Sequence, residues 1–95
     1  GEERPEGYLG VELRDRTDGG QGAVISTVQD GTPADEAGVE PGDLVVASDG
    51  APIDGATGLI AAIRDLRPGD TTVLTVMRDG EMIDLTVTLT DRPDD

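Results

Sequence analysis

The chain lacks cysteine, histidine, lysine, tryptophan and phenylalanine, and Tyr8 is its only aromatic residue. Without cysteine there is neither a disulfide nor a thiolate metal site, and cysteine usage gives no information on the redox compartment. Without histidine, cysteine or lysine, the Ser-His-Asp, Cys-His and Ser-Lys arrangements of nucleophilic catalysis cannot form. We therefore expect a non-catalytic chain with an aliphatic core, and we assign it no catalytic residue, no metal ligand and no cofactor.

Long apolar runs and basic residues are also scarce. No run approaches the roughly 18 apolar residues of a membrane span, so direct insertion into a membrane is not expected. The net charge is −14, and all seven basic residues are arginine. A surface this acidic repels nucleic acid and anionic lipid, so we expect neither as a partner.

A chain of 95 residues is short enough for a single domain. We expect that domain to have its folded part over about residues 7–90. The polar ends, residues 1–6 and 91–95, are expected to be flexible.

Five β-strands are predicted from runs rich in β-branched and other apolar residues. They cover residues 8–14, 23–28, 44–48, 72–77 and 82–89. Asp49-Gly50 is a tight-turn signal and is followed by a short edge segment over 51–53. Asp79-Gly80 is the strongest hairpin signal in the chain and joins the last two strands.

Two helices are predicted between the strands. Residues 32–38 carry the signals of a very short helix, with Thr32 at the N-cap, Pro33 at the first helical position and Gly38 at the C-cap. The second helix shows apolar residues at spacings of three and four from Leu59 to Leu66, and either Asp54 or Thr57 can cap it.

This order of elements predicts an α+β fold, a small partly open β-barrel or sandwich of five to six strands with two helices. Its interior is predicted to draw on apolar residues of the strands. These are Val24, Ile25, Val28, Leu44, Val46, Val73, Val76, Leu85 and Val87.

The stretch from Glu6 to Leu13 is the most informative part of the sequence. Gly7 and Gly10 permit backbone conformations that a Cβ would forbid, and such a loop can turn successive N–H groups toward an anion. A carboxylate held there could belong to the end of a peptide that adds a strand to the sheet. On their own, the two glycines are more simply explained as the start of a strand, and Tyr8 could either line the groove or pack into the core.

Several motifs in order together resemble a PDZ domain over about residues 7–89. They are Gly7-Tyr8-Leu9-Gly10-Val11, Gly31-Thr32-Pro33-Ala34, Ala37-Gly38-Val39, Pro41-Gly42-Asp43-Leu44-Val45, Asp49-Gly50 and Arg67-Pro68-Gly69-Asp70. The glycine loop lies in the first strand and a closing strand follows the Arg78–Glu81 hairpin, an order that resembles the circularly permuted bacterial arrangement. That arrangement is typical of HtrA (Deg) trypsin-like serine proteases.

The resemblance implies binding of C-terminal or unfolded apolar peptides, which recruits substrates and regulates an attached protease domain of the same parent chain. It implies a peptide carboxylate-binding loop at Gly7, Tyr8, Leu9 and Gly10. It also implies a peptide groove lined by Val11, Glu12, Leu13, Leu59, Ala62, Ile63 and Leu66. A parent of this kind acts in protein quality control outside the cytoplasm, in the periplasm, in the cell envelope or as a secreted protein.

The chain departs from many eukaryotic family members, which carry a histidine at the start of the groove helix. Because this chain has no histidine, we expect an apolar end of the peptide rather than Ser or Thr two residues before its terminus. We assign Leu59, Ile63 and Leu66 to the groove, so Ile63→Asp should weaken binding and leave the fold intact. Alternatives are a site-2 or C-terminal processing protease as the parent, a non-proteolytic scaffold, and self-association through a sheet edge.

Overall fold

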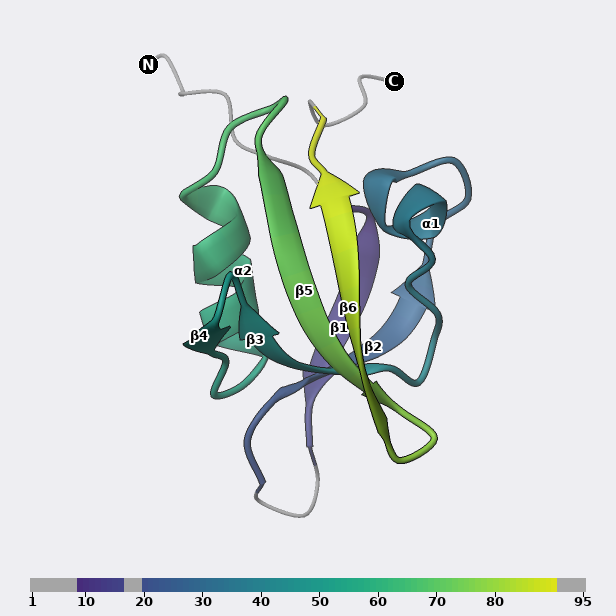
Figure 1. Ribbon diagram of the computed structural model, residues 1–95, viewed down its shortest axis with the longest axis vertical. Coiled ribbons are helices and arrows are strands. Elements are labelled where there is room, and N and C mark those ends of the chain that lie inside the picture. Colours follow the sequence, from purple (N-terminus) through teal and green to yellow (C-terminus); the bar gives the residue numbers. More distant parts are fainter. Residues whose placement is uncertain (1–8, 17–19, 91–95) are drawn as a thin grey trace.

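The computed structural model describes residues 9–16 and 20–90, which form one antiparallel sheet and two helices (Figure 1). The strands are β1 (Val11–Asp15), β2 (Ala23–Val28), β3 (Leu44–Ser48), β4 (Ala51–Pro52), β5 (Thr71–Arg78) and β6 (Glu81–Thr88). The helices are α1 (Pro33–Ala37) and α2 (Ala56–Arg64). The sheet order is β1-β2-β3-β5-β6, and β4 pairs with β3. The predicted α+β fold with two helices is confirmed.

The two helices lie at opposite sides of the sheet in Figure 1. The helix α1 packs against β6, whereas α2 packs against β1, β2 and β3. Within the described part of the chain, β1 pairs with β2 alone, so its other edge lies beside α2 without a strand partner. This edge strand and its neighbouring helix carry most of the residues predicted for the site.

The two Asp-Gly dipeptides predicted to form tight turns, at 49–50 and 79–80, do form two-residue turns between paired strands. Asp49 and Gly50 have φ values of 50° and 83° between Ser48 and Ala51, which pair across the turn. Asp79 and Gly80 have φ values of 52° and 82° at the end of the β5–β6 hairpin. Positive φ at both central residues gives the twist that a two-residue hairpin needs, so both predicted turns are confirmed.

The caps predicted for α1 are also confirmed. Thr32 is the N-cap, and its Oγ1 accepts a hydrogen bond from the Asp35 N–H at 3.4 Å. The Asp35 carboxylate reaches back to the Gly31 N–H at 2.9 Å, so both residues satisfy donors at the start of the helix. Gly38 ends the helix with φ 94°, the left-handed conformation that favours glycine.

The capping prediction for α2 is wrong. The N-cap is Gly55, which has no side chain, and neither Asp54 nor Thr57 caps the helix. The capping oxygen comes from Asp15 at the end of β1, whose Oδ1 accepts the Ala56 N–H at 2.8 Å. A residue 41 positions away in the sequence gives no local signal for this contact.

The core uses the opposite face of several predicted strands. Val24, Leu44, Val46 and Val73 are only half-buried and lie outside the core cluster, although Ile25, Val76 and Val87 are buried as predicted. The neighbours that replace them in the interior are Ala23, Val45 and Leu74, each with no exposed surface. Uninterrupted apolar runs do not reveal which face is buried, because the register of pairing decides it.

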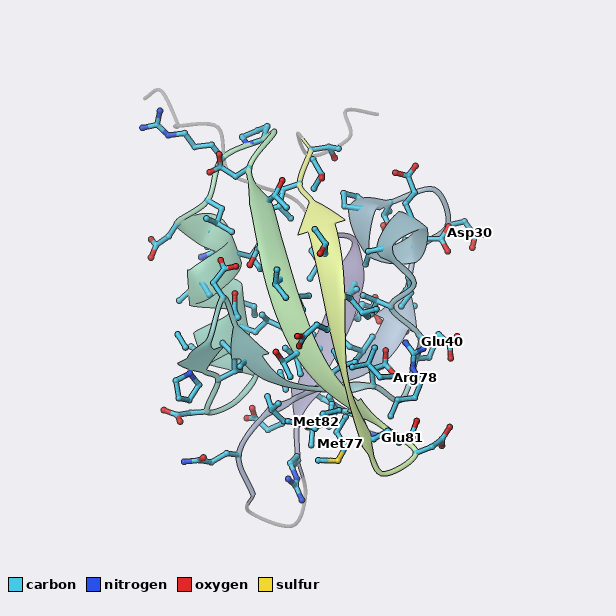
Figure 2. The ribbon with its side chains drawn as sticks, viewed as in Figure 1. Asp30, Glu40, Met77, Arg78, Glu81 and Met82 are labelled. Carbon is cyan, nitrogen blue, oxygen red and sulfur yellow. The ribbon has the colours of Figure 1, made fainter. Side chains whose placement is uncertain are left out.

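The register places one apolar residue from each of four strands in a row on the outer face. Val24 pairs with Leu44, Leu44 with Met77, and Met77 with Met82. Met77 and Met82 lie side by side in Figure 2 and are 36% and 58% exposed. Because this outer row is apolar, two of its members, Val24 and Leu44, were wrongly predicted to lie in the interior.

No helix within residues 9–16 and 20–90 is both long enough and apolar enough to cross a membrane. The expected domain boundaries stay a prediction, since residues 1–8 and 91–95 lie outside the described residues.

Candidate functional site

The loop that precedes β1 is held by its carbonyl groups. The Leu9 carbonyl accepts the Ala34 N–H of α1 at 3.0 Å, and the Gly10 carbonyl accepts the Gln29 N–H at 2.9 Å. Within the described residues, no backbone hydrogen bond is donated by the N–H of Leu9 or Gly10. The predicted loop residues Gly7 and Tyr8 lie outside the described residues.

Gly10 occupies a place that no other residue fits. Its φ is +89°, and a Cβ there would lie 2.3–2.6 Å from side-chain atoms of Thr32. Thr32 cannot give way easily, because it is buried and its Oγ1 also donates to the Gln29 carbonyl at 2.6 Å. The glycine therefore lets the loop pack directly on the cap of α1, which fixes the orientation of its backbone.

The three predicted groove residues of β1 alternate between the interior and solvent. Val11 and Leu13 are half-buried and pack against the core, whereas Glu12 is exposed. A bulge in β2 leaves Ser26 opposite this point, where its Oγ donates to the Glu12 carbonyl at 3.1 Å. The bulge bends the strand pair, and among the described strands none pairs with the edge of β1 that lies beside α2.

The apolar residues predicted for the groove on α2 are more deeply buried than expected. Leu59 is fully buried and Ile63 is 7% exposed, and both belong to the core cluster. Ala62 is half-buried against that cluster, and so is Leu66, which was predicted for the same helix but lies two residues beyond its end at Arg64. Ile60 was not singled out for the groove, yet it is the exposed large apolar residue of this helix, at 42%.

An ion pair missed by the sequence reasoning anchors the far side of α1. The Arg78 Nε and Nη2 donate to the two carboxylate oxygens of Asp43 at 2.8 Å and 2.7 Å, and Nη2 also donates to the Gly38 carbonyl at 2.8 Å. Glu40 lies 3.8 Å from Nη1, and Figure 2 shows Arg78 and Glu40 turned toward each other. Asp43 is 2% exposed. Its place in the Pro-Gly-Asp turn was visible in the sequence, but its partner 35 residues away was not.

The ion pair changes the ionisation of both partners. Burial by itself raises the pKa of Asp43, but hydrogen bonds from Arg78 and from the Glu40 N–H outweigh it, with help from the Arg78 charge. The pKa of Asp43 is consequently below its ordinary value. The hydrogen bond to Asp43 raises the pKa of Arg78 further above its already high value.

A second polar network connects the Asp49-Gly50 turn to β5. The Asp49 carboxylate accepts the Val73 N–H and the Thr72 hydroxyl, each at 2.9 Å, and these bonds lower the pKa of Asp49. The Thr72 hydroxyl also lies 3.1 Å from the Ser48 Oγ. Ser48 and Thr72 are thus buried polar residues with partners and form part of the packing rather than a reactive pair.

Within the described residues, an antiparallel sheet has an open edge strand beside a helix, and a glycine loop precedes that strand. Small α+β domains with one such edge strand and one such helix form a class to which this fold belongs. In the described part of the chain, no group of three or more His, Cys, Asp or Glu residues is placed to hold a metal ion.

The chain belongs to the PDZ domain family, whose profile matches residues 7–89. The resemblance stated from the motifs is thereby confirmed. A probable periplasmic serine endoprotease DegP-like of Chlamydia muridarum is 34% identical over 96 residues, covering 92% of this chain and 19% of that protein. The protein of the same description from Halomonas elongata is 37% identical over 97 residues, covering 93% of this chain and 20% of that protein.

The serine endoprotease DegS of Escherichia coli K12 is 31% identical over 96 residues, covering 92% of this chain and 27% of that protein. The HtrA-type protease AlgW with decapeptide has a TM-score of 0.87 and 26% identity, covering 96% of this chain and 31% of that chain. AlgW with tripeptide has a TM-score of 0.83 and 26% identity, covering 95% of this chain and 33% of that chain. The chain thus spans about a fifth to a quarter of the length of these curated relatives.

Proposed function

We propose that this chain is a peptide-binding module that captures the C-terminal end of an apolar peptide by adding it as a strand beside β1. The observation that carries the proposal is the edge of β1 next to α2, which has no strand partner among residues 9–16 and 20–90, with Leu9 and Gly10 just before the start of β1. A peptide on this edge would gain backbone hydrogen bonds along β1 and apolar contacts from α2.

The terminal carboxylate is assigned to the N–H groups of Tyr8, Leu9 and Gly10. The carbonyls of Leu9 and Gly10 already hold the loop to Ala34 and Gln29, and that orientation supports a role for their N–H groups as donors to a ligand. Two or more backbone donors aimed at one carboxylate form a compact anion site.

The groove wall is assigned to β1 and α2. Leu59 and Ile63 contribute the buried base of the wall, while Ala62 and Leu66 contribute its half-buried part. We add Ile60, because an exposed isoleucine on the helix beside an open strand edge offers apolar surface that a peptide side chain can cover. Burial of one peptide Leu or Val contributes roughly 1.5–3 kcal/mol, so affinities near the micromolar range are expected after the cost of ordering the peptide.

We propose that the parent is an HtrA-like serine protease located outside the cytoplasm, in which this module recruits substrate and regulates the protease domain. Relatives described as periplasmic serine endoproteases and as HtrA-type proteases with bound peptides support this assignment. The net charge of −14 favours basic or neutral peptide tails over acidic ones, most strongly at low salt.

A library of C-terminal decapeptides, measured by fluorescence anisotropy with the 95-residue chain, tests the function. Peptides ending in apolar residues should bind, and amidation of the terminus should weaken the best ligand at least about tenfold because it removes the charge. An amidated peptide that binds as well as its free acid would refute carboxylate capture. Sedimentation at the same concentrations separates ligand binding from self-pairing through β1.

A further inference from the structure

One side chain joins the end of β1 to the start of α2. Asp15 is the last residue of β1, and its Oδ1 accepts the N–H of Ala56, the first residue of α2, at 2.8 Å. A Cβ at Gly55, the residue before the helix, would lie 2.7 Å from the same oxygen. The missing side chain at position 55 therefore leaves the space that the Asp15 carboxylate occupies.

A backbone contact supports the same junction. Gly22 is the residue before β2, and its N–H donates to the Asp54 carbonyl at 3.1 Å. The β1–β2 pair thus holds the start of α2 at two adjacent points, one through a side chain and one through the main chain. Both points lie at the end of β1 opposite to Leu9 and Gly10.

We infer that Asp15 is a positioning residue for peptide binding, whose carboxylate fixes the spacing between the two walls of the groove. The inference rests on the proposed function, because β1 and α2 are walls only if a peptide lies between them. A helix that is already fixed before binding does not have to be ordered by the ligand, so the contact raises affinity through preorganisation.

The position of the contact predicts which peptides depend on it. The six residues from Gly10 to the end of β1 at Asp15 span about 17 Å, whereas a tripeptide seated at Gly10 extends about 10 Å. A decapeptide therefore passes the Asp15–Ala56 contact, and a tripeptide ends before it. Loss of the contact should weaken the longer ligand more than the shorter one.

The test uses the tightest decapeptide of the library and the tripeptide formed by its last three residues. Asp15→Ala removes the acceptor, and Gly55→Ala displaces it from the other side. Each should weaken decapeptide binding about threefold to tenfold and change tripeptide binding less than about twofold, since a lost helix cap has an effect of this size. The double variant should lose no more than either single one, because both break one contact.

Two matched variants separate geometry from charge. Asp15→Asn retains an oxygen that can accept the Ala56 N–H, and Asp54→Asn removes the same charge from the residue beside Gly55. Both should bind the decapeptide within about twofold of the unaltered chain at moderate salt, because the screened charge contributes little. Circular dichroism verifies that each variant folds. If Asp15→Ala does not fold, the inference is tested by Gly55→Ala and Asp15→Asn, of which only Gly55→Ala should weaken decapeptide binding.

Equal losses for both peptides would overturn the inference, because they indicate general destabilisation. Equal losses for Asp15→Asn and Asp15→Ala would overturn it in favour of charge. A tighter decapeptide complex in Asp15→Ala would show that the contact obstructs the groove instead of preparing it. If the unaltered chain binds no free-carboxylate peptide, the proposed function itself fails and this inference falls with it.

Discussion

Arg78 and Asp43 form a two-point ion pair that links the end of β5 to the turn before β3, with bonds of 2.8 Å and 2.7 Å. Arg78 also binds the carbonyl of Gly38 at the C-cap of α1, and the N-terminal part of α1 binds the Leu9 carbonyl through Ala34. The pair consequently lies at one end of a short chain of contacts whose other end is the loop assigned to the peptide carboxylate.

Asp43→Asn should destabilise the fold, because it leaves the Arg78 charge without its buried counterion. We expect a loss of about 2 kcal/mol in the free energy of unfolding, below the 3–5 kcal/mol typical of a broken buried pair since Arg78 is partly accessible to water. Urea denaturation measures this loss. Asp65→Asn, at an exposed position after α2, is the control and should change stability by less than about 0.5 kcal/mol. Equal effects of the two changes would contradict a structural role for the pair.

Stability should fall in acid. The pKa of Asp43 is lower in the folded state than in the unfolded chain, so its contribution is fully present above the unfolded value of about 3.9 and is lost as the pH falls through the folded value. The pKa of Asp49 is also lowered in the folded state, so Asp49 likewise contributes stability that is lost in acid. Urea unfolding at several pH values from about 6 to about 2 should therefore show a steeper loss below about pH 4 for the unaltered chain than for Asp43→Asn. Parallel curves would show that Asp43 contributes nothing to the acid sensitivity.

Gly10→Ala and Gly31→Ala separate backbone strain from steric conflict. Both glycines have positive φ, but a Cβ at Gly31 meets nothing within 4 Å, whereas one at Gly10 overlaps Thr32. We expect Gly31→Ala to cost about 1 kcal/mol and Gly10→Ala at least about 3 kcal/mol, measured by chemical denaturation. Gly10→Ala should also weaken peptide binding, since it moves the loop off α1. Similar costs at the two positions would mean that Thr32 does not constrain the loop.

The burial of α2 residues changes the expected outcome of Ile63→Asp. Because Ile63 is 7% exposed and part of the core cluster, a carboxylate there should prevent folding rather than act on the groove alone. Ile60→Asp, at a 42% exposed position, should keep the fold and weaken binding of apolar peptides several-fold. Circular dichroism and anisotropy measure the two effects. A folded Ile63→Asp variant that has lost only its affinity would restore the original assignment of the faces.

The two Asp-Gly turns and the caps of α1 could be predicted from the sequence because short stretches of chain decide them. The positive φ values of Asp49-Gly50 and Asp79-Gly80, and the cap conformations of Thr32 and Gly38, depend on residues within a few positions of one another. The PDZ fold was predicted in the same way, from several such local motifs in a fixed order. Local chemistry therefore determined the elements, their order and the family.

Tertiary structure alone decided which face of each strand is buried and how the site is held together. The pairing register places Val45 and Leu74 inside and leaves Leu44 and Met77 outside, a choice that a continuous apolar run leaves open. The Asp43–Arg78 and Asp15–Ala56 contacts join residues 35 and 41 positions apart. Such contacts depend on where the folded chain brings distant residues together, because neither partner has a local pattern that identifies the other.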